Sequence, residues 1–304
     1  MQQNNKTTLF LILTFAISFT AAGLFWLLGG ELRGTGGLIL ATSYMFIPMI
    51  SVLVVEKIIY REDIRKKLFI SFNPDIWFLI AWLIAPVIVF GSVAASLLVP
   101  GVSYSPGMEG MFDSYKEMMT PEELEQMRIS IEVMPFHPVW MTLVSGMVAG
   151  LTINAVAGFG EELGWRGFLV RQFRDMSFIK ASVLTGIVWG LWHAPLILMG
   201  HNYPQYPVAG VFMMVLFCVL LSPLFLYITV KSRSVIAASV MHGTLNGTAG
   251  ISLMLLEGGN DLVTGVAGLA GGFSIIIVTV AFYFYDHNIS REKIMTSKIS
   301  AYLK

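Results

Sequence analysis

Apolar residues form long uninterrupted runs along this chain, and short polar connections separate the runs. A helix needs about 20 residues to cross a hydrocarbon core about 30 Å thick, and eight runs reach roughly that length. Strands of a transmembrane barrel would instead alternate apolar and polar positions over about ten residues. The pattern therefore predicts an all-α, polytopic bundle with spans at residues 8–29, 38–56, 76–99, 138–160, 181–200, 208–230, 234–256 and 262–285.

The first apolar run could be mistaken for a secretory signal peptide, because Lys6 precedes it. The run is longer than a usual signal-peptide core, and no convincing cleavage site with a polar mature start follows it. We therefore expect it to be a retained first span.

Basic residues divide unevenly between the two sides that eight spans define. With the N-terminus in the cytoplasm, sixteen Lys and Arg residues fall on the cytoplasmic side, and only Arg33, Lys116 and Arg128 fall on the other. Cytoplasmic connections are enriched in Lys and Arg, so this division predicts an N-in, C-in topology. The sixteen are Lys6, Lys57, Arg61, Arg65, Lys66, Lys67, Arg166, Arg171, Arg174, Lys180, Lys231, Arg233, Arg291, Lys293, Lys298 and Lys304.

Composition agrees with one membrane domain over residues 1–304. Only 12% of the residues are charged, whereas about a quarter are charged in an average soluble domain. The formal net charge is zero, which gives no case for a nucleic-acid partner. The single cysteine, Cys218, lies inside an apolar run, so neither an intrachain disulfide nor a cysteine metal site can form.

The longest connection, residues 101–137, is acidic and is expected on the outer side. Thr120 is followed by proline and two glutamates, which is a typical helix start. Leu124, Met127 and Ile131 then fall at i, i+3 and i+7, which predicts a short amphipathic helix on the outer surface or over the bundle. A lid and a solvated loop are both compatible with this pattern. The acidic residues are Glu109, Asp113, Glu117, Glu122, Glu123, Glu125 and Glu132.

The first polar cluster near membrane depth is Gly160-Glu161-Glu162-Leu163-Gly164-Trp165-Arg166-Gly167, at the end of the fourth predicted span. Charges inside a bilayer are costly, so these residues need an explanation. Adjacent carboxylates on a helix point about 100° apart. Glu162 and Arg166, four residues apart, can form an ion pair, which leaves Glu161 to face elsewhere. The structural alternative is that these charged residues simply mark the end of a span at the membrane interface.

Two histidines lie deep inside later spans. His193 belongs to Trp189-Gly190-Leu191-Trp192-His193-Ala194-Pro195 in the fifth span. His242 begins His242-Gly243-Thr244-Leu245-Asn246 in the seventh span, so His242 and Asn246 project from one helix face. A hydrogen-bonded core histidine and an interhelical hydrogen bond are the structural alternatives. The other three histidines, His137, His201 and His287, fall at span ends or in loops.

Taken together, these residues come from three separate helices and could converge on one cavity. Glu, His, His and Asn can deprotonate a water molecule and stabilise an oxyanion. No serine or cysteine stands out as a nucleophile, so hydrolysis by activated water is the simplest interpretation. Glu161, His193 and His242 would be the ligands if zinc were bound. Their spacing does not match His-Glu-x-x-His, so no metal is favoured.

At these positions the sequence resembles the CAAX protease and bacteriocin-processing family, also called the Abi family. The resemblance rests on Glu161-Glu162-x-x-Trp165-Arg166-Gly167, Trp189-x-x-x-His193 and His242-x-x-x-Asn246, which occur over residues 161–246 in the expected order. The family includes intramembrane endopeptidases that remove the last three residues of prenylated proteins. The first 135 residues add only a compatible membrane topology.

The resemblance implies a role for each matched residue. Glu161 would be the general base on a water molecule, and His193 would help to hold that water. His242 and Asn246 would donate hydrogen bonds to the developing oxyanion. Glu162 would pair with Arg166 and shape the site, and Trp165 and Trp189 would support it or contact substrate. We expect a glutamate-dependent, metal-independent endopeptidase.

Two other functions are compatible with the same residues. One is a non-enzymatic membrane immunity or scaffolding protein that binds a peptide or membrane partner in the cavity. The other is a small transporter or proton relay, which would couple solute flux to pH. Substitution of Glu161 and His193 would abolish hydrolysis but spare binding. The expected partners are a peptide or membrane-protein substrate and the lipid bilayer, and short loops without a targeting tail favour a bacterial plasma membrane.

Overall fold

The computed structural model describes residues 2–116 and 119–302. Glu117 and Lys304, which belong to the acidic and basic sets above, lie outside the described residues. Almost all regular structure is helical, with one short antiparallel pair of strands, β1 (Ser103–Tyr104) and β2 (Leu256–Glu257). The helices are α1 (Gln2–Leu27), α2 (Thr35–Met45), α3 (Ile47–Val52), η1 (Leu53–Ile59), α4 (Ile76–Ser96), α5 (Glu109–Tyr115), α6 (Pro121–Glu132), α7 (Pro138–Leu151), α8 (Ile153–Glu162), η2 (Leu163–Leu169), α9 (Val170–Gln172), α10 (Phe178–Trp192), α11 (Ala194–Leu198), α12 (Pro207–Ser232), α13 (Val235–Thr248), α14 (Ile251–Leu255), α15 (Leu269–Phe284), η3 (Tyr285–Ile289), η4 (Ile294–Thr296) and η5 (Ile299–Ala301).

The all-α, polytopic membrane bundle is confirmed, since every predicted span is helical over most of its length. Within the described ranges, five helical stretches are long and apolar enough to cross a membrane, and α7 with α8–α9 makes a sixth if the bent pair counts as one span. The helices α10 and α13 are shorter. The 14 residues of α13 rise about 21 Å, less than a hydrocarbon core. The count of eight spans and the N-in, C-in orientation stay predictions.

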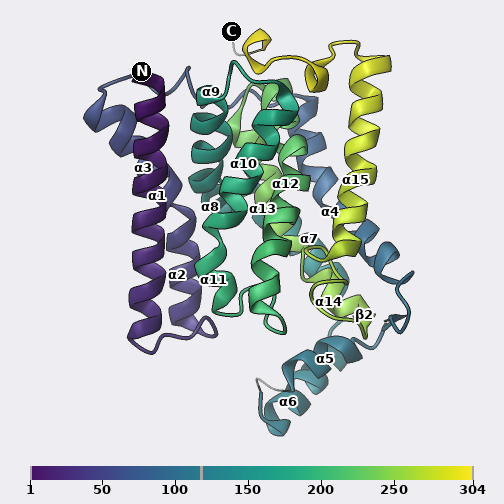
Figure 1. The fold of residues 1–304 in the computed structure, drawn as a ribbon. Helices are drawn as coiled ribbons and strands as arrows, with labels where there is room; N and C mark the ends of the chain where they lie inside the picture. Colours follow the sequence, from purple (N-terminus) through teal and green to yellow (C-terminus); the bar gives the residue numbers. More distant parts are fainter. Residues whose placement is uncertain (1, 117–118, 303–304) are drawn as a thin grey trace.

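The two ends of the bundle differ in what they carry (Figure 1). Helix α1 begins at the end where α9 and the C-terminal segment lie, and α5, α6 and α14 lie at the opposite end. The basic residues of α9 and of the C-terminal segment therefore lie far from the acidic residues of α6. This separation agrees with the charge division that the sequence analysis used to orient the chain.

Helix α13 lies in the interior of the bundle. It packs against α4, α7, α8 and α12, and eleven of its 14 residues are buried. Around it, α10 packs on α12, and α15 packs on α4. A helix surrounded by other helices presents its side chains to protein rather than to lipid, so polar residues on α13 can meet partners from several elements.

The fourth predicted span, residues 138–160, is bent rather than straight, and the helix continues beyond its predicted end. Helix α7 ends at Leu151, α8 begins at Ile153, and the two axes differ by 54°. Thr152, between them, has φ −125° and ψ −107°, outside the helical region. The helical path then continues beyond residue 160 through η2 and α9 to Gln172. The motif that begins at Glu161 therefore lies inside a helix rather than at its end.

The eighth predicted span, residues 262–285, begins later than expected. Helix α15 starts at Leu269, because residues 262–268 form a compact turn in which the Leu269 N–H donates to the Leu262 carbonyl at 3.0 Å. Gly265 adopts φ +75° in this turn, a conformation that glycine accepts without steric cost. Its N–H donates to Ser96 Oγ at 3.0 Å, which attaches the turn to the end of α4.

The amphipathic helix predicted in segment 101–137 is confirmed as α6. Thr120 Oγ1 accepts from the Glu123 N–H at 3.3 Å, and Glu123 Oε2 accepts from the Thr120 N–H at 2.8 Å, which is a complete capping box. The predicted apolar face packs on a small separate core. That core comprises the buried residues Met108, Met111 and Phe112, with Leu124, Met127, Ile131, Tyr115 and Met254 packed against it. Together α5 and α6 project beyond the end of the bundle (Figure 1).

Two basic residues of the cytoplasmic set are buried in ion pairs. Lys6 is 7% exposed, and its Nζ lies 3.1 Å from Glu56 Oε1 and 3.0 Å from Glu62 Oε1. Hydrogen bonds from Lys67 and Lys6 lower the pKa of Glu62 to about 2, so this carboxyl group in the connection after η1 is charged at neutral pH. Arg166 is 1% exposed in η2 rather than in a connection.

Candidate active site

The first motif lies where α8 continues into the π-helix η2. Glu161 and Glu162 are the last two residues of α8, and Trp165 and Arg166 lie within η2. All seven residues of η2 are buried. Single π-helical turns inside longer helices are rare and occur frequently at functional sites. Here the turn carries two large buried side chains, the indole of Trp165 and the guanidinium of Arg166.

Two indole N–H groups hold the carboxylate of Glu161. Trp189 Nε1 donates to Glu161 Oε2 at 2.6 Å, and Trp165 Nε1 donates to the same oxygen at 3.2 Å. The indole N–H is a donor only, so both contacts fix the direction of these hydrogen bonds. Oε2 is therefore committed to the tryptophans, and Oε1 is the oxygen available for other chemistry.

Glu162 joins Arg166 to His242. Arg166 NH1 lies 3.1 Å from Glu162 Oε2, in the predicted i, i+4 ion pair, and also donates to Oε1 at 3.2 Å. His242 Nδ1 lies 2.8 Å from the same Oε1. Glu162 and Arg166 are both fully buried as side chains. A carboxylate paired with arginine accepts only, so Nδ1 carries the proton in this contact.

His242 also faces the other glutamate. Its Nε2 lies 3.8 Å from Glu161 Oε1, too far for a direct hydrogen bond but within the span of one bridging water. The two adjacent carboxylates thus meet opposite sides of one imidazole. The sequence predicted divergent glutamates and did not predict that both would face His242.

Glycines permit this approach of α13 to α8. A Cβ added at Gly158 would lie 3.1 Å from the Ser239 carbonyl oxygen and 3.2 Å from His242 Cβ. A Cβ added at Gly243 would lie 2.6 Å from the Asn154 backbone. The Asn154 side chain donates to the Gly243 carbonyl at 3.2 Å. Close backbone packing therefore sets the distance between His242 and the glutamates.

A break between α10 and α11 orients His193. In a regular helix the His193 N–H would donate to the Trp189 carbonyl, but here it donates to the Gly190 carbonyl at 3.2 Å. The Trp189 carbonyl instead accepts from His193 Nδ1 at 2.8 Å. A carbonyl only accepts, so Nδ1 carries the proton, and in the neutral ring Nε2 is left as an acceptor.

Asn246 and His193 are more exposed than the other two residues predicted to be catalytic. Asn246 lies one helical turn beyond His242 on α13, as the spacing predicted, and it is exposed. His193 is half-buried, whereas Glu161 is 2% exposed and His242 is 5% exposed.

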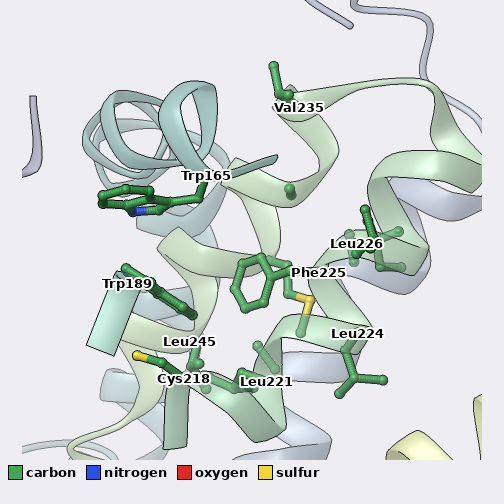
Figure 2. Close-up of a cluster of buried hydrophobic side chains, with 14 of the residues drawn as sticks. Trp165, Trp189, Cys218, Leu221, Leu224, Phe225, Leu226, Val235 and Leu245 are labelled. Atoms are coloured by element: carbon green, nitrogen blue, oxygen red, sulfur yellow. The ribbon is translucent and has the colours of Figure 1, made fainter. Parts of the chain in front are cut away.

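An aromatic and apolar wall encloses the site. Figure 2 shows Trp165 and Trp189 near Phe225, with Cys218 and Leu221 in the same cluster. The Arg166 guanidinium lies 4.4 Å from the ring centroids of both Trp189 and Phe225. Cys218 is fully buried, as its apolar surroundings in the sequence suggested. Such a wall keeps bulk water away and strengthens the electrostatic interactions inside.

Each of the three residues that would hold zinc has one donor atom in contact with a protein group. In the part of the chain that the structure describes, no group of three or more His, Cys, Asp and Glu side chains is placed to hold a metal ion. One donor atom of each of these residues has a protein partner, and Glu161 Oε1 and the Nε2 atoms of His242 and His193 are left for other contacts. Glu161 Oε2 accepts from two indoles, His242 Nδ1 lies against Glu162, and His193 Nδ1 donates to a carbonyl. Metal independence stays a prediction.

Several site residues were missed from the sequence. Ser222 and Phe225 of α12 contact Arg166, although α12 carries none of the predicted residues. Tyr44 of α2 donates to the Trp192 carbonyl at 3.0 Å, next to His193. The signal for Ser222 was a polar residue inside a strongly apolar run. The contact of Tyr44, by contrast, depends on tertiary packing over a long sequence separation.

Comparison with known proteins places the motifs in a family. Residues 135–248 match the family described as Rce1-like, type II CAAX prenyl endopeptidase Rce1-like. The chain is also 31% identical over 151 residues to CAAX prenyl protease 2 of Methanococcus maripaludis, an alignment that covers 47% of this chain and 52% of the relative. The chain thus spans about half the length of the curated relative it matches. All eight predicted site residues lie within the matched segment. That segment thus resembles the Rce1-like family of CAAX prenyl endopeptidases, in agreement with the resemblance drawn from the three motifs.

Proposed function

We propose that this protein is an intramembrane endopeptidase that hydrolyses a peptide bond with a water activated by Glu161. The observation that carries the proposal is the position of Glu161 Oε1, which lies 3.8 Å from His242 Nε2 while its partner oxygen is held by two indoles. A fixed carboxylate with one free oxygen beside an imidazole is suited to general base catalysis.

In the proposed reaction Glu161 Oε1 takes a proton from water, and the hydroxyl oxygen attacks the carbonyl carbon of the substrate. His193 Nε2 accepts a hydrogen bond from the second O–H of that water. It can do so because Nδ1 carries the ring proton and donates it to the Trp189 carbonyl. This hydrogen bond positions the water, and the hydrogen stays on the oxygen that attacks.

The tetrahedral intermediate carries a negative oxygen that needs donors. Asn246 donates through its side-chain amide. His242, protonated on both ring nitrogens, donates from Nδ1 to Glu162 and from Nε2 to the oxyanion. Glu161 then returns its proton to the leaving amine, and the C–N bond breaks. Preorganised donors of this kind stabilise the transition state more than they would in water.

The substrate class in this proposal is a peptide or a segment of a membrane protein that reaches the site within the bilayer. The name of the Methanococcus maripaludis relative suggests a prenylated protein as one substrate to test. The proposal places the chain as a multi-pass protein in a cell membrane, with a bacterial plasma membrane as the expected location.

Replacement of His193 by alanine tests the hydrolase proposal. We expect the rate of cleavage to fall about 10²-fold, the usual cost of misplacing a reacting group. Purified protein is incubated with prenylated CAAX peptides and unmodified peptides, and products are identified by mass spectrometry. His287→Ala is the control, because His287 is exposed on η3. If wild type cleaves no peptide, or if His193→Ala cleaves as fast as wild type, the proposal is wrong.

Removal of metals is expected to leave cleavage unchanged. The protein is dialysed against 1,10-phenanthroline. It is then assayed with whichever of the prenylated and unmodified peptides the untreated protein cleaves fastest. A rate within twofold of the untreated protein is the expected result, because the proposed base is the Glu161 carboxylate, which takes a proton from water without a metal. Loss of activity that zinc restores would overturn the metal-independent part of the proposal.

A further inference from the structure

Ser222 is a buried polar residue that none of the three motifs contains. It lies in α12, is 1% exposed, and precedes Pro223 in an apolar stretch. A hydroxyl group buried without a partner is unfavourable, so a buried serine in such a stretch calls for a partner. Its partner is Arg166, whose NH2 donates to Ser222 Oγ at 3.2 Å.

Arg166 depends on few acceptors. NH1 is used by Glu162, NH2 is used by Ser222, and Nε has no hydrogen-bond partner among the described residues. The faces of the guanidinium lie against Trp189 and Phe225, which offer no hydrogen-bond acceptor atom. Ser222 is therefore the contact that fixes the guanidinium from the side opposite Glu162.

A chain of buried contacts leads from Ser222 to the proposed reacting groups. Ser222 holds Arg166, Arg166 holds Glu162, and Glu162 Oε1 lies 2.8 Å from His242 Nδ1. The imidazole of His242 then presents Nε2 toward Glu161. The side chains that make these contacts are at most 6% exposed, so solvent does not screen the contacts.

We propose that Ser222 is a positioning residue of this active site, which acts through Arg166 and Glu162 to set the proton position and orientation of His242. The proposal rests on the proposed function for its kinetic part only. Ser222 does not contact substrate; it determines where the Nδ1 proton of His242 resides and which way Nε2 points.

The kinetic test compares Ser222→Ala with Ser92→Ala. Ser92 is also fully buried, but its Oγ donates only to the nearby Val89 carbonyl. We expect Ser222→Ala to lower kcat about ten- to a hundredfold, the range of a lost hydrogen bond to a charged group, with little change in KM. Its pH profile of kcat should differ from wild type, and that of Ser92→Ala should overlay wild type. Ser222→Thr, which restores the hydroxyl acceptor, should recover most of the rate.

A coupling test asks whether Ser222 acts through Arg166. In Arg166→Lys, which keeps the positive charge but lacks the second guanidinium nitrogen, adding Ser222→Ala should change kcat by less than twofold. A full additive loss in the double variant would mean that Ser222 acts elsewhere, and the proposal would be wrong.

The decisive measurement does not require turnover. With ¹⁵N-labelled histidine, the ring signals of His242, assigned through His242→Gln, should shift in Ser222→Ala and remain in place in Ser92→Ala. Unchanged His242 signals in a folded Ser222→Ala would overturn the proposal. If those signals shift but wild type cleaves no peptide, the proposed function fails while the positioning role stands.

Discussion

Replacing Glu161 by glutamine is expected to lower the rate of peptide hydrolysis by about 10²- to 10⁴-fold, the contribution of a general base. The amide is nearly isosteric with the carboxylate, and its oxygen can still accept from Trp165 and Trp189. The fold should therefore persist while the group that takes the proton from water is lost. The measurement is kcat in the peptide assay, with size-exclusion profile and thermal midpoint recorded for each variant.

Glu125→Gln is the matched control for this substitution. Glu125 undergoes the same chemical change but lies exposed on α6. Its kcat should equal that of wild type. A Glu161→Gln variant that retains more than a tenth of the wild-type rate would exclude Glu161 as the general base and favour a binding function for the same cavity.

Replacing Arg166 by glutamine is expected to destabilise the protein by about 3 to 5 kcal/mol, because the buried carboxylate of Glu162 loses its arginine partner and keeps only the contact with His242 Nδ1. Both side chains of this ion pair are 0% exposed. The substitution also removes the cation from between the rings of Trp189 and Phe225. The free energy of unfolding is measured by denaturant titration in detergent micelles.

Lys67→Gln is the matched comparison, because it removes the cation of an exposed ion pair rather than a buried one. Lys67 Nζ lies 2.8 Å from Glu62 Oε2, but the two side chains are 43% and 35% exposed. Exposed ion pairs contribute about 1 kcal/mol or less, so this variant should unfold close to wild type. Equal losses in Arg166→Gln and Lys67→Gln would show that the buried carboxylate of Glu162 does not depend on its arginine partner.

The helical class and the polar clusters were readable from the sequence because both depend on local rules. Apolar runs predict helices, since lipid offers the backbone no hydrogen bonds. The Glu162–Arg166 pair follows from i, i+4 spacing, and the start of α6 follows from a capping box. These features need no knowledge of how the helices pack.

Features that depend on tertiary packing were not readable. The bend at Thr152 accompanies close packing of α7 and α8 on α13, and the π-helical turn of η2 leaves no clear pattern in the sequence. The meeting of Glu161 and Glu162 at one imidazole requires the glycine contact between α8 and α13. Ser222 stands out as a polar residue in an apolar run, but its contact with Arg166 could not be predicted, because the two residues are 56 positions apart in the sequence.

The small separate core of α5 and α6 implies that this unit can open on its own. Its core has three buried side chains, and Met254 is the residue of α14 that packs on it. Units with little buried apolar area exchange their amide hydrogens through local opening, at a lower free energy than the rest of a protein. We therefore expect the backbone amides of α5 and α6 to exchange with solvent faster than those of the motif-bearing helices.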